Sequence, residues 1–322
     1  MILERPPRIV TAPEAADPNY QAQDDLRHRA AGGGRMRDSL FWEVIMPEQQ
    51  LGFQSYLYLT GTGKAGFNVA LWGPEDKPYV LDLVQGSVPD EMDFDDFSFS
   101  GMRLRQPQIR QTASLSYESE KVKLELDFYG LHDAFSFHQN PDGVPNWFAL
   151  NRFEQTGWVR GFVEFAGRRI EWDRMGHRDH SWGVRDWGLP HHWKWIVAYT
   201  PDGSRIVNGW IWIARGEWGF AGYVVRDGEL IPIKHINQHT QYDADMTQRR
   251  LEAELVDIRG QTCLLTLDRF GIVKLLTHDK LGTAIIRAAC TSTIDGQSGA
   301  GTLETHWQGS YLEHLIAANN RS

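Results

Sequence analysis

The stretch RIVNGWIWIARGEWGFAGYVVRDG, residues 205–228, contains two apolar runs of strand length separated by a short polar segment. Successive side chains of a β-strand point to opposite faces, so Trp210 and Trp212 share one face of the first run. Ile211 and Ile213 then share the other face. Because both faces are apolar, both must be covered, and the tryptophan face is the more suitable wall for a cavity. The stretch predicts paired β-strands inside a packed structure.

Runs of the same kind occupy most of the chain. They lie at 53–59, 66–72, 79–84, 121–130, 158–167, 168–175 and 195–200, and five more lie between residues 249 and 311. Turn dipeptides such as Asp142-Gly143 and Asp202-Gly203 separate them, and helical periodicity is confined to the C-terminal GSYLEHLIAANN. About 17 short strands are too many for one small barrel. They predict an all-β fold of two tandem antiparallel barrels or sandwiches.

Three segments are predicted along the chain. Residues 1–37 are rich in Pro, Ala, Gly and charge, which is typical of an irregular arm. Two β domains follow, at 38–190 and 191–322, with a boundary near residues 185–195. Ligand-binding clefts often lie at such junctions.

Composition excludes several classes of protein. The 322 residues carry a formal net charge of −9, whereas nucleic-acid and membrane-surface binders usually show a basic excess. No apolar run approaches the roughly 20 residues of a membrane-spanning helix. The N-terminus has charge and proline where a secretion signal would be apolar, and Cys263 and Cys290 fit reduced thiols. We therefore expect a cytoplasmic protein with no nucleic-acid partner and no integral membrane segment.

The motif GHRDHSWGVRDWGLPHHWKWI, residues 176–196, concentrates ionisable and aromatic side chains. It holds four His, four Trp, two Arg and two Asp, and 10 of the 13 Trp of the chain lie between Trp147 and Trp218. Tryptophan is large and amphipathic, so such a cluster indicates either an aromatic-lined pocket or a heavy core.

Several interpretations of this motif compete. Possible metal ligands are His177, Asp179, His180, His191 and His192. Strand alternation separates His177 and Asp179 from His180, and no known metal spacing is matched, so we predict no metal ligand. Ser181 has no GxSxG elbow around it, and TGTGKAGF (60–67) is better explained as a hairpin turn than as a phosphate loop.

A purely structural interpretation is a buried polar network. In it, Arg178 or Arg185 would pair with Asp179 or Asp186, and the tryptophans would pack around these pairs.

The segment RDHSWGVRDW resembles the signature of the carotenoid 1,2-hydratase (hydroxyneurosporene synthase) and AttH-like family. The Asp-His-x-Trp-Gly core of that signature is matched by Asp179, His180, Trp182 and Gly183. The resemblance implies two lipocalin-like β-barrel domains, with His180 and Trp182 lining the active site. It also implies chemistry on hydrophobic small molecules, such as hydration, dehydration, isomerisation or cyclisation, mostly without cofactors.

The chain departs from the family at one position. The hydratases carry a Tyr-x-Asp on a following strand, whose Asp protonates the alkene. The corresponding stretch here, RIVNGWIW, offers Asn208 and no carboxylate. The proton donor is therefore expected among Asp179, Asp186 and Glu217.

These residue types suit proton transfer on an apolar guest. A carboxyl group in a tryptophan-walled cavity is held protonated by desolvation, an imidazole can relay its proton, and indole faces stabilise a carbocation. The predicted catalytic residues are Asp179, His180, Trp182, His177 and Asp186. The predicted substrate-binding residues are Trp187, Arg185, His192, Trp193, Trp195, Asn208, Trp210 and Trp212.

The predicted function is a cofactor-independent lyase or isomerase acting on a hydrophobic terpenoid-, steroid- or polyketide-like molecule. One alternative is a lipocalin-like carrier of such molecules, which would need the tryptophans but not the ionisable groups beside them. Another is a metal-dependent hydrolase, which would contain stoichiometric zinc or iron.

Overall fold

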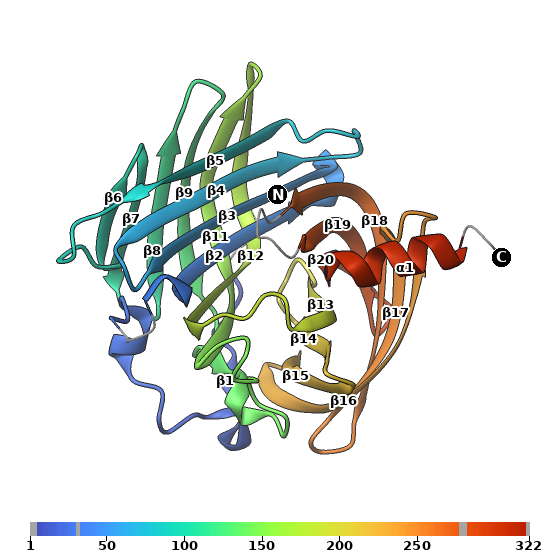
Figure 1. The fold of residues 1–322 in the computed structure, drawn as a ribbon. Coiled ribbons are helices and arrows are strands. Elements are labelled where there is room, and N and C mark those ends of the chain that lie inside the picture. The colour runs from blue at the N-terminus through green and yellow to red at the C-terminus, as the bar shows by residue number, and fades with distance from the viewer. Residues whose placement is uncertain (1–4, 30–32, 277–281, 320–322) are drawn as a thin grey trace.

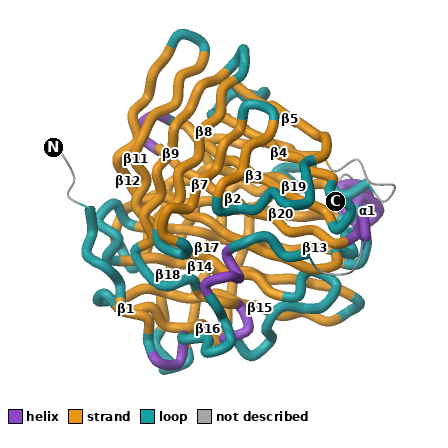
Figure 2. Tube along the Cα trace, turned by 90° about the vertical axis from the view of Figure 1, so that its left-hand side faces the viewer, coloured by secondary structure: helices purple, strands orange, loops and turns teal. Residues whose placement is uncertain are grey.

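The structure, a computed structural model, describes residues 5–29, 33–276 and 282–319. Within these residues, 20 strands form two curved sheets, one α-helix follows them, and five short 3₁₀ helices lie between strands or in the arm (Figure 1). Figures 1 and 2 both show the first sheet curled above the second. The all-β prediction is confirmed.

The first sheet is a curled half-barrel. Its strands, in spatial order, are β5 (Val80–Ser87), β4 (Lys64–Trp72), β3 (Leu51–Thr60), β2 (Met36–Met46), β12 (Arg168–Val184), β11 (Asn151–Phe165), β9 (Val122–Gly130), β8 (Thr112–Glu118), β7 (Met102–Gln108) and β6 (Asp96–Phe99). The short β10 (Phe135–Ser136) pairs with β11. Among the described residues the edge strands β5 and β6 do not pair with each other, so the sheet does not close.

The second sheet is a closed antiparallel barrel of eight strands. They are β13 (Pro190–Tyr199), β14 (Arg205–Ala214), β15 (Glu217–Arg226), β16 (Glu229–Tyr242), β17 (Gln248–Asp257), β18 (Thr262–Leu276), β19 (Ala284–Ile294) and β20 (Gln297–Trp307). Pairing of β16 with β17 closes the barrel. The helix α1 (Gly309–Asn319) packs beside it, and β1 (Val10–Thr11) of the N-terminal arm pairs in parallel with β16.

Burial patterns explain where the first sheet meets the barrel. Strands β7, β8 and β9 alternate between buried and exposed residues, as expected for strands with one solvated face. By contrast, β2 and the second half of β12 are buried on both faces. One of these faces lies against the barrel. The other lines the inside of the half-barrel, where its apolar side chains pack with other residues of the first sheet, and arm residues contact it at Asp38, Arg178 and His180.

The predicted strands and helix are largely confirmed. The run 205–214 coincides with β14, GSYLEHLIAANN with α1, and residues 60–67 with the β3–β4 hairpin turn. The main difference is one of length, because the run predicted at 168–175 continues as β12 through the first nine residues of the motif. The chain passes from one sheet to the other between Val184 and Pro190. The proposed domain limits remain a prediction.

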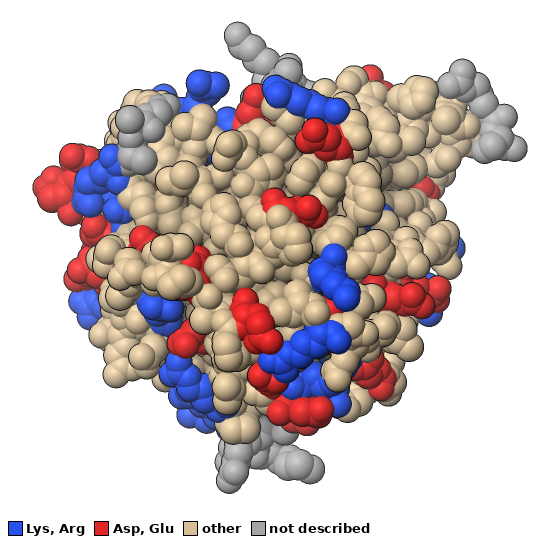
Figure 3. Space-filling view, turned by 90° about the horizontal axis from the view of Figure 1, so that it is seen from below, with Lys and Arg blue, Asp and Glu red and all other residues tan. Residues whose placement is uncertain are grey.

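Charged side chains of both signs are interspersed on the face drawn in Figure 3. Among the exposed charges of the described residues, Arg259 lies 2.6 Å from Glu229 and 3.2 Å from Glu14. No helix in the described part of the chain is long and apolar enough to cross a membrane.

Asn140 joins two barrel strands where their ladder ends. The β15–β16 pairing stops at Tyr223 and Pro232. Beyond it, the buried Asn140 amide donates to the carbonyls of Gly222 and Ile233, both at 2.8 Å, and accepts from the Gly222 N–H at 2.9 Å.

Replacing Asn140 with alanine should therefore destabilise the protein by about 2–3 kcal/mol, because buried backbone groups lose their partners. Urea denaturation measures the effect, and the exposed Asn237→Ala on β16 is the control. Equal shifts in the two variants would contradict this role for Asn140.

Candidate active site

Strand β12 divides the motif between two faces. His177 and Asp179 point toward the barrel, where they contact residues of β11 and β13. Arg178 and His180 point into the half-barrel, toward Asp25 of the arm. The predicted alternation is confirmed, and the predicted catalytic residues therefore belong to two separate clusters.

The cluster facing the barrel, here called the junction cluster, centres on Glu154. The Glu154 carboxylate accepts from Arg152 Nε at 2.5 Å and from Asn208 Nδ2 at 3.1 Å, and lies 2.6 Å from His177 Nε2. Arg152 also donates from Nη2 to Asp179 Oδ2 at 2.9 Å. One guanidinium thus bridges two carboxyl groups, and Asn208 joins them from the barrel.

A second arginine extends the cluster across the sheets. Arg287 of β19 donates to Glu43 of β2 at 3.0 Å and also to Glu304 of β20. Glu43 further accepts from Thr302 at 2.9 Å, and Glu304 accepts from the Trp193 indole N–H at 3.0 Å.

The indole of Trp195 lies between the two arginines. Its ring centroid is 5.2 Å from Arg152 Cζ and 4.9 Å from Arg287 Cζ, and 5.6 Å from the His177 ring. Trp193 stacks on His306 with centroids 3.8 Å apart. Predicted ionisable and aromatic residues therefore meet at the junction of the two sheets.

Burial controls protonation in the junction cluster. It raises the pKa of Glu154 to about 7 and that of Asp179 to about 6, against the opposing charge of Arg152. Burial lowers the pKa of His177 to about 3, so its imidazole is neutral. A carboxyl group in this cluster can therefore hold a proton near neutral pH.

The members differ in accessibility. The side chains of Glu154 and His177 are 0% exposed, whereas Asp179 and Arg152 keep 7% and 11%. Asp179 is thus the more exposed of the two carboxyl groups that Arg152 bridges.

A tight cleft, with no room for a water-sized sphere, lies beside the cluster. It is lined by Trp147, Phe148, Arg185, Asp186, Trp187, Pro190 and Trp193. The Phe148 ring contacts both Arg185 and Arg152, whose Cζ atoms lie 4.6 and 5.6 Å from its centroid. Phe148 therefore stands between the cleft and the Arg152–Asp179 pair.

The other predicted site residues are distributed around these features. Asp186 is exposed and Trp187 half-buried in the cleft wall, whereas the buried Arg185 donates to Ser181 Oγ at 2.9 Å. Trp210 packs on Phe148, with centroids 4.7 Å apart, and contacts Trp212. His192 stacks on Trp307 at 3.8 Å, and Glu217 is exposed at a turn.

Gly183 of the motif has a packing role. Its φ is +143°, and a Cβ there would lie 2.3 Å from the Leu150 nitrogen. That nitrogen donates to the Trp182 carbonyl at 2.7 Å. Only glycine allows this close approach of residues 149–150 to β12.

Sequence reasoning missed five charged members of the cluster: Glu43, Arg152, Glu154, Arg287 and Glu304. A sequence signal existed for Glu43 and Arg287, whose neighbours in LFWEVIM and AIIRAAC are mostly apolar, but not for the other three, which lie among polar residues. A charge at such a position requires a partner inside the protein.

Replacing Glu154 with glutamine tests the proton balance of the cluster. Because burial raises its pKa from 4.5 to about 7, the folded protein keeps a proton that the unfolded chain releases in this window. As the pH rises from 4.5 to about 7, ionisation of Glu154 therefore lowers the free energy of unfolding by up to roughly 3 kcal/mol, at about 1.4 kcal/mol per pKa unit.

The stability of Glu154→Gln relative to wild type should accordingly improve between pH 5 and pH 7.5. Urea denaturation of both proteins at the two pH values measures this difference. His177 also changes the stability in this pH range, with the opposite sign because its pKa is lowered. It is present in both proteins, so the comparison isolates the effect of Glu154. A difference that does not change with pH would refute the protonation of Glu154.

Comparison with known proteins identifies the family of the chain and solved structures with the same fold. The domain family DUF7064, described as a domain of unknown function, matches residues 21–309. No curated protein matches the chain. Solved structures with the same fold include a putative AttH from Nitrosomonas europaea, with TM-score 0.58, 16% identity and coverage of 85% of this chain and 92% of that one.

Two further structures share the fold at 11% identity. Kievitone hydratase from Nectria haematococca has TM-score 0.61 and coverage of 96% of this chain and 99% of that one. CghA, solved with Sch210972, has TM-score 0.55 and coverage of 84% and 88%. The chain belongs to the DUF7064 family, with a fold similar to that of AttH, kievitone hydratase and CghA.

Proposed function

We propose that the protein is a cofactor-independent enzyme of the hydratase, dehydratase or cyclase type. It acts by proton transfer on a hydrophobic terpenoid-, steroid- or polyketide-like small molecule. The observation that carries the proposal is the bridge made by Arg152 between two buried carboxyl groups, Glu154 and Asp179, beside the indole of Trp195.

Asp179 is the proton donor in this proposal. Its O–H proton passes to one carbon of a substrate alkene, and the π electrons form the new C–H bond. Water then adds to the resulting cation, and the proton it releases returns to the carboxylate. The reverse sequence eliminates water from an alcohol, and loss of a different proton from the cation moves the double bond.

The neighbouring groups act through Asp179 or through the substrate. Arg152 positions the carboxyl group, and Glu154 with the neutral His177 fixes Arg152. The Trp195 and Trp193 rings already contact the two arginines and His306, whereas Trp147 and Trp187 line the cleft. A cation–π contact with an indole in a dry site is worth about 2 kcal/mol. That energy corresponds to roughly a 30-fold change in rate.

The substrate would reach Asp179 through the cleft. The cleft as it stands has no room for a water-sized sphere, whereas typical ligand sites measure roughly 300–1,000 Å³. Binding therefore requires Phe148 to move away from Arg152 and join the cleft to the cluster.

The solved structures support the reaction class. One of them is named a hydratase, and another holds the small molecule Sch210972. Both share the fold at 11% identity, so the reaction of this chain depends on its own residues.

A substrate panel tests the proposal. Terpenoid, steroid and polyketide-like alkenes and alcohols are incubated with the purified protein, and mass spectrometry follows the gain or loss of water and the appearance of isomers. We expect turnover of at least one class. Tight binding of several ligands without turnover of any would instead support a carrier.

A further inference from the structure

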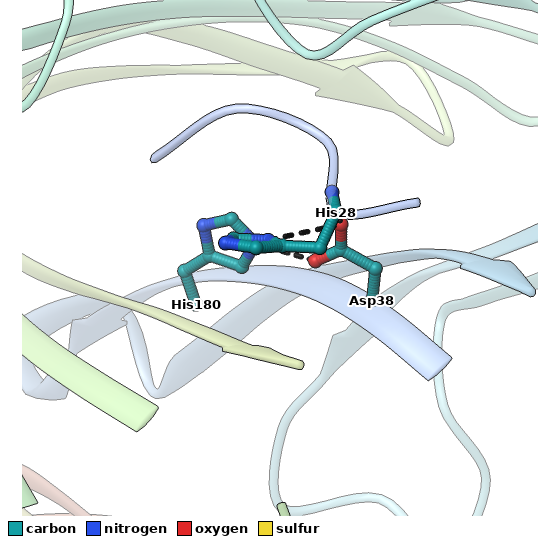
Figure 4. Close-up of side chains that lie close together, drawn as sticks. All are labelled: His28, Asp38 and His180. Carbon is teal, nitrogen blue, oxygen red and sulfur yellow. Dashed lines mark hydrogen bonds and ion pairs between the residues drawn. The ribbon is translucent and has the colours of Figure 1, made fainter. Parts of the chain in front are cut away.

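The face of β12 that points away from the junction cluster carries a second group of ionisable side chains. Figure 4 shows His28 of the arm beside Asp38 of β2 and His180 of β12. One potential ligand atom from each lies within 4.8 Å of the other two. Asp38 and His180 are 1% and 0% exposed, and His28 is partly exposed at the surface.

Both imidazoles present one nitrogen to Asp38 and the other to a second carboxylate. His180 Nε2 lies 2.6 Å from Asp38 Oδ1, and its Nδ1 lies 3.5 Å from Asp25 Oδ1. His28 Nδ1 lies 3.4 Å from Asp38 Oδ2, and its Nε2 lies 3.8 Å from Asp24 Oδ1. Metal-binding histidines are oriented in this way, with the nitrogen away from the metal directed at a carboxylate.

Three of the four ring nitrogens lack a hydrogen bond. Both nitrogens of His28 and Nδ1 of His180 are buried and have no hydrogen-bond partner. A buried polar atom without a partner costs about 1–3 kcal/mol. A cation next to Asp38 would give His28 Nδ1 a partner and would direct the remaining N–H groups toward Asp24 and Asp25.

The carboxylates around the two imidazoles also suit a bound cation. Three carboxylates, those of Asp24, Asp25 and Asp38, surround the two imidazoles. One guanidinium, that of Arg178, lies 2.9 Å from Asp25. With both imidazoles neutral, as metal ligands must be, two negative charges remain, and one divalent cation balances them.

We propose that His28, Asp38 and His180 form a binding site for a divalent transition metal, with Zn²⁺ the best match to two nitrogen ligands and one oxygen ligand. Zinc ligands in a tetrahedron lie roughly 3.3 Å apart. The His28–Asp38 spacing already fits, and the His180–Asp38 hydrogen bond opens to admit the ion. Three protein ligands leave the fourth position for water or an anion.

The metal would fasten the arm to the first sheet. His28 is its only ligand from the described arm residues, and the His28 ring stacks on Trp182 with centroids 3.9 Å apart. This site lies on the opposite face of β12 from Asp179 and does not depend on the proposed enzymatic reaction.

Metal titration of the full chain, freed of metal by a chelator, tests the site. We expect one equivalent of Zn²⁺ by calorimetry, a visible Co²⁺ absorption band and a higher Tm with Zn²⁺. His28→Ala should weaken Zn²⁺ binding at least about 100-fold, and Asp24→Asn about 10- to 100-fold. His239→Ala, an exposed histidine on β16, should bind as wild type does.

The proposal is overturned if wild type takes up no stoichiometric Zn²⁺ or Co²⁺. It is equally overturned if His28→Ala binds Zn²⁺ as tightly as His239→Ala. Should His28→Ala fail to fold, the Asp24→Asn variant decides, because that change leaves all three ligands in place. Unchanged Zn²⁺ affinity in Asp24→Asn would then refute the site.

Discussion

Replacement of Asp179 with asparagine is expected to lower kcat by about 10²- to 10⁴-fold, the usual contribution of a general acid. Asparagine has nearly the same shape and can still accept from Arg152, so the fold and the ligand affinity should survive. The loss should therefore fall on kcat and leave substrate binding within a few-fold. Steady-state kinetics on a substrate identified in the panel measure both quantities.

Asp173→Asn is the matched control for this prediction. Asp173 lies on the same strand as Asp179, but its carboxylate is 40% exposed and pairs with Arg160 at 2.9 Å. Its replacement should leave kcat within about twofold of wild type. Wild-type turnover in Asp179→Asn would show that another group donates the proton.

Replacement of Arg287 with methionine is expected to destabilise the protein by about 3–5 kcal/mol, because it leaves a buried charge without its partner. Glu43 is 0% exposed and would keep only the Thr302 hydroxyl. Glu304 would keep only the Trp193 indole N–H among its side-chain partners. Urea denaturation at pH 8 measures the loss, since burial raises the pKa of Glu43 to about 7 and the wild-type pair must be ionised.

An exposed ion pair in the same barrel provides the control. Arg250 lies 2.6 Å from Asp268, whose side chain is half exposed, so Arg250→Met should cost less than about 1 kcal/mol. Adding Glu43→Gln to Arg287→Met should recover at least about 1 kcal/mol, because it removes the unpaired carboxylate. Equal losses in Arg287→Met and Arg250→Met would show that the cross-sheet pair has no special role.

Local sequence patterns predicted the strands and one feature of the site. The run RIVNGWIWIA coincides with β14, because the apolar residues of a buried strand are visible in its own sequence. The same alternation separates His177 and Asp179 from His180. These features depend only on the period of a strand and not on its partners.

Partners distant in the chain could not be predicted in this way. The contact between Arg287 and Glu43 joins residues 244 positions apart, and it exists only because the barrel packs on the first sheet. The sequence spacing of the motif also gave no metal site, since His28 comes from the arm and Asp38 from another strand. The register of strand pairing and the packing of the sheets determine such clusters, and neither can be predicted from the sequence of a single strand.

Deuterium transfer from solvent tests the central claim most directly. The alkene, as the substrate of hydration or isomerisation or as the product of dehydration run in reverse, is turned over in D₂O, and mass spectrometry and NMR locate deuterium on carbon in the compound formed from it. The proposal predicts one deuterium at the carbon that receives the proton, with its incorporation lost in Asp179→Asn and kept in Asp173→Asn. Product formed without carbon-bound deuterium, or labelled equally by Asp179→Asn, would contradict proton donation at the junction of the two sheets.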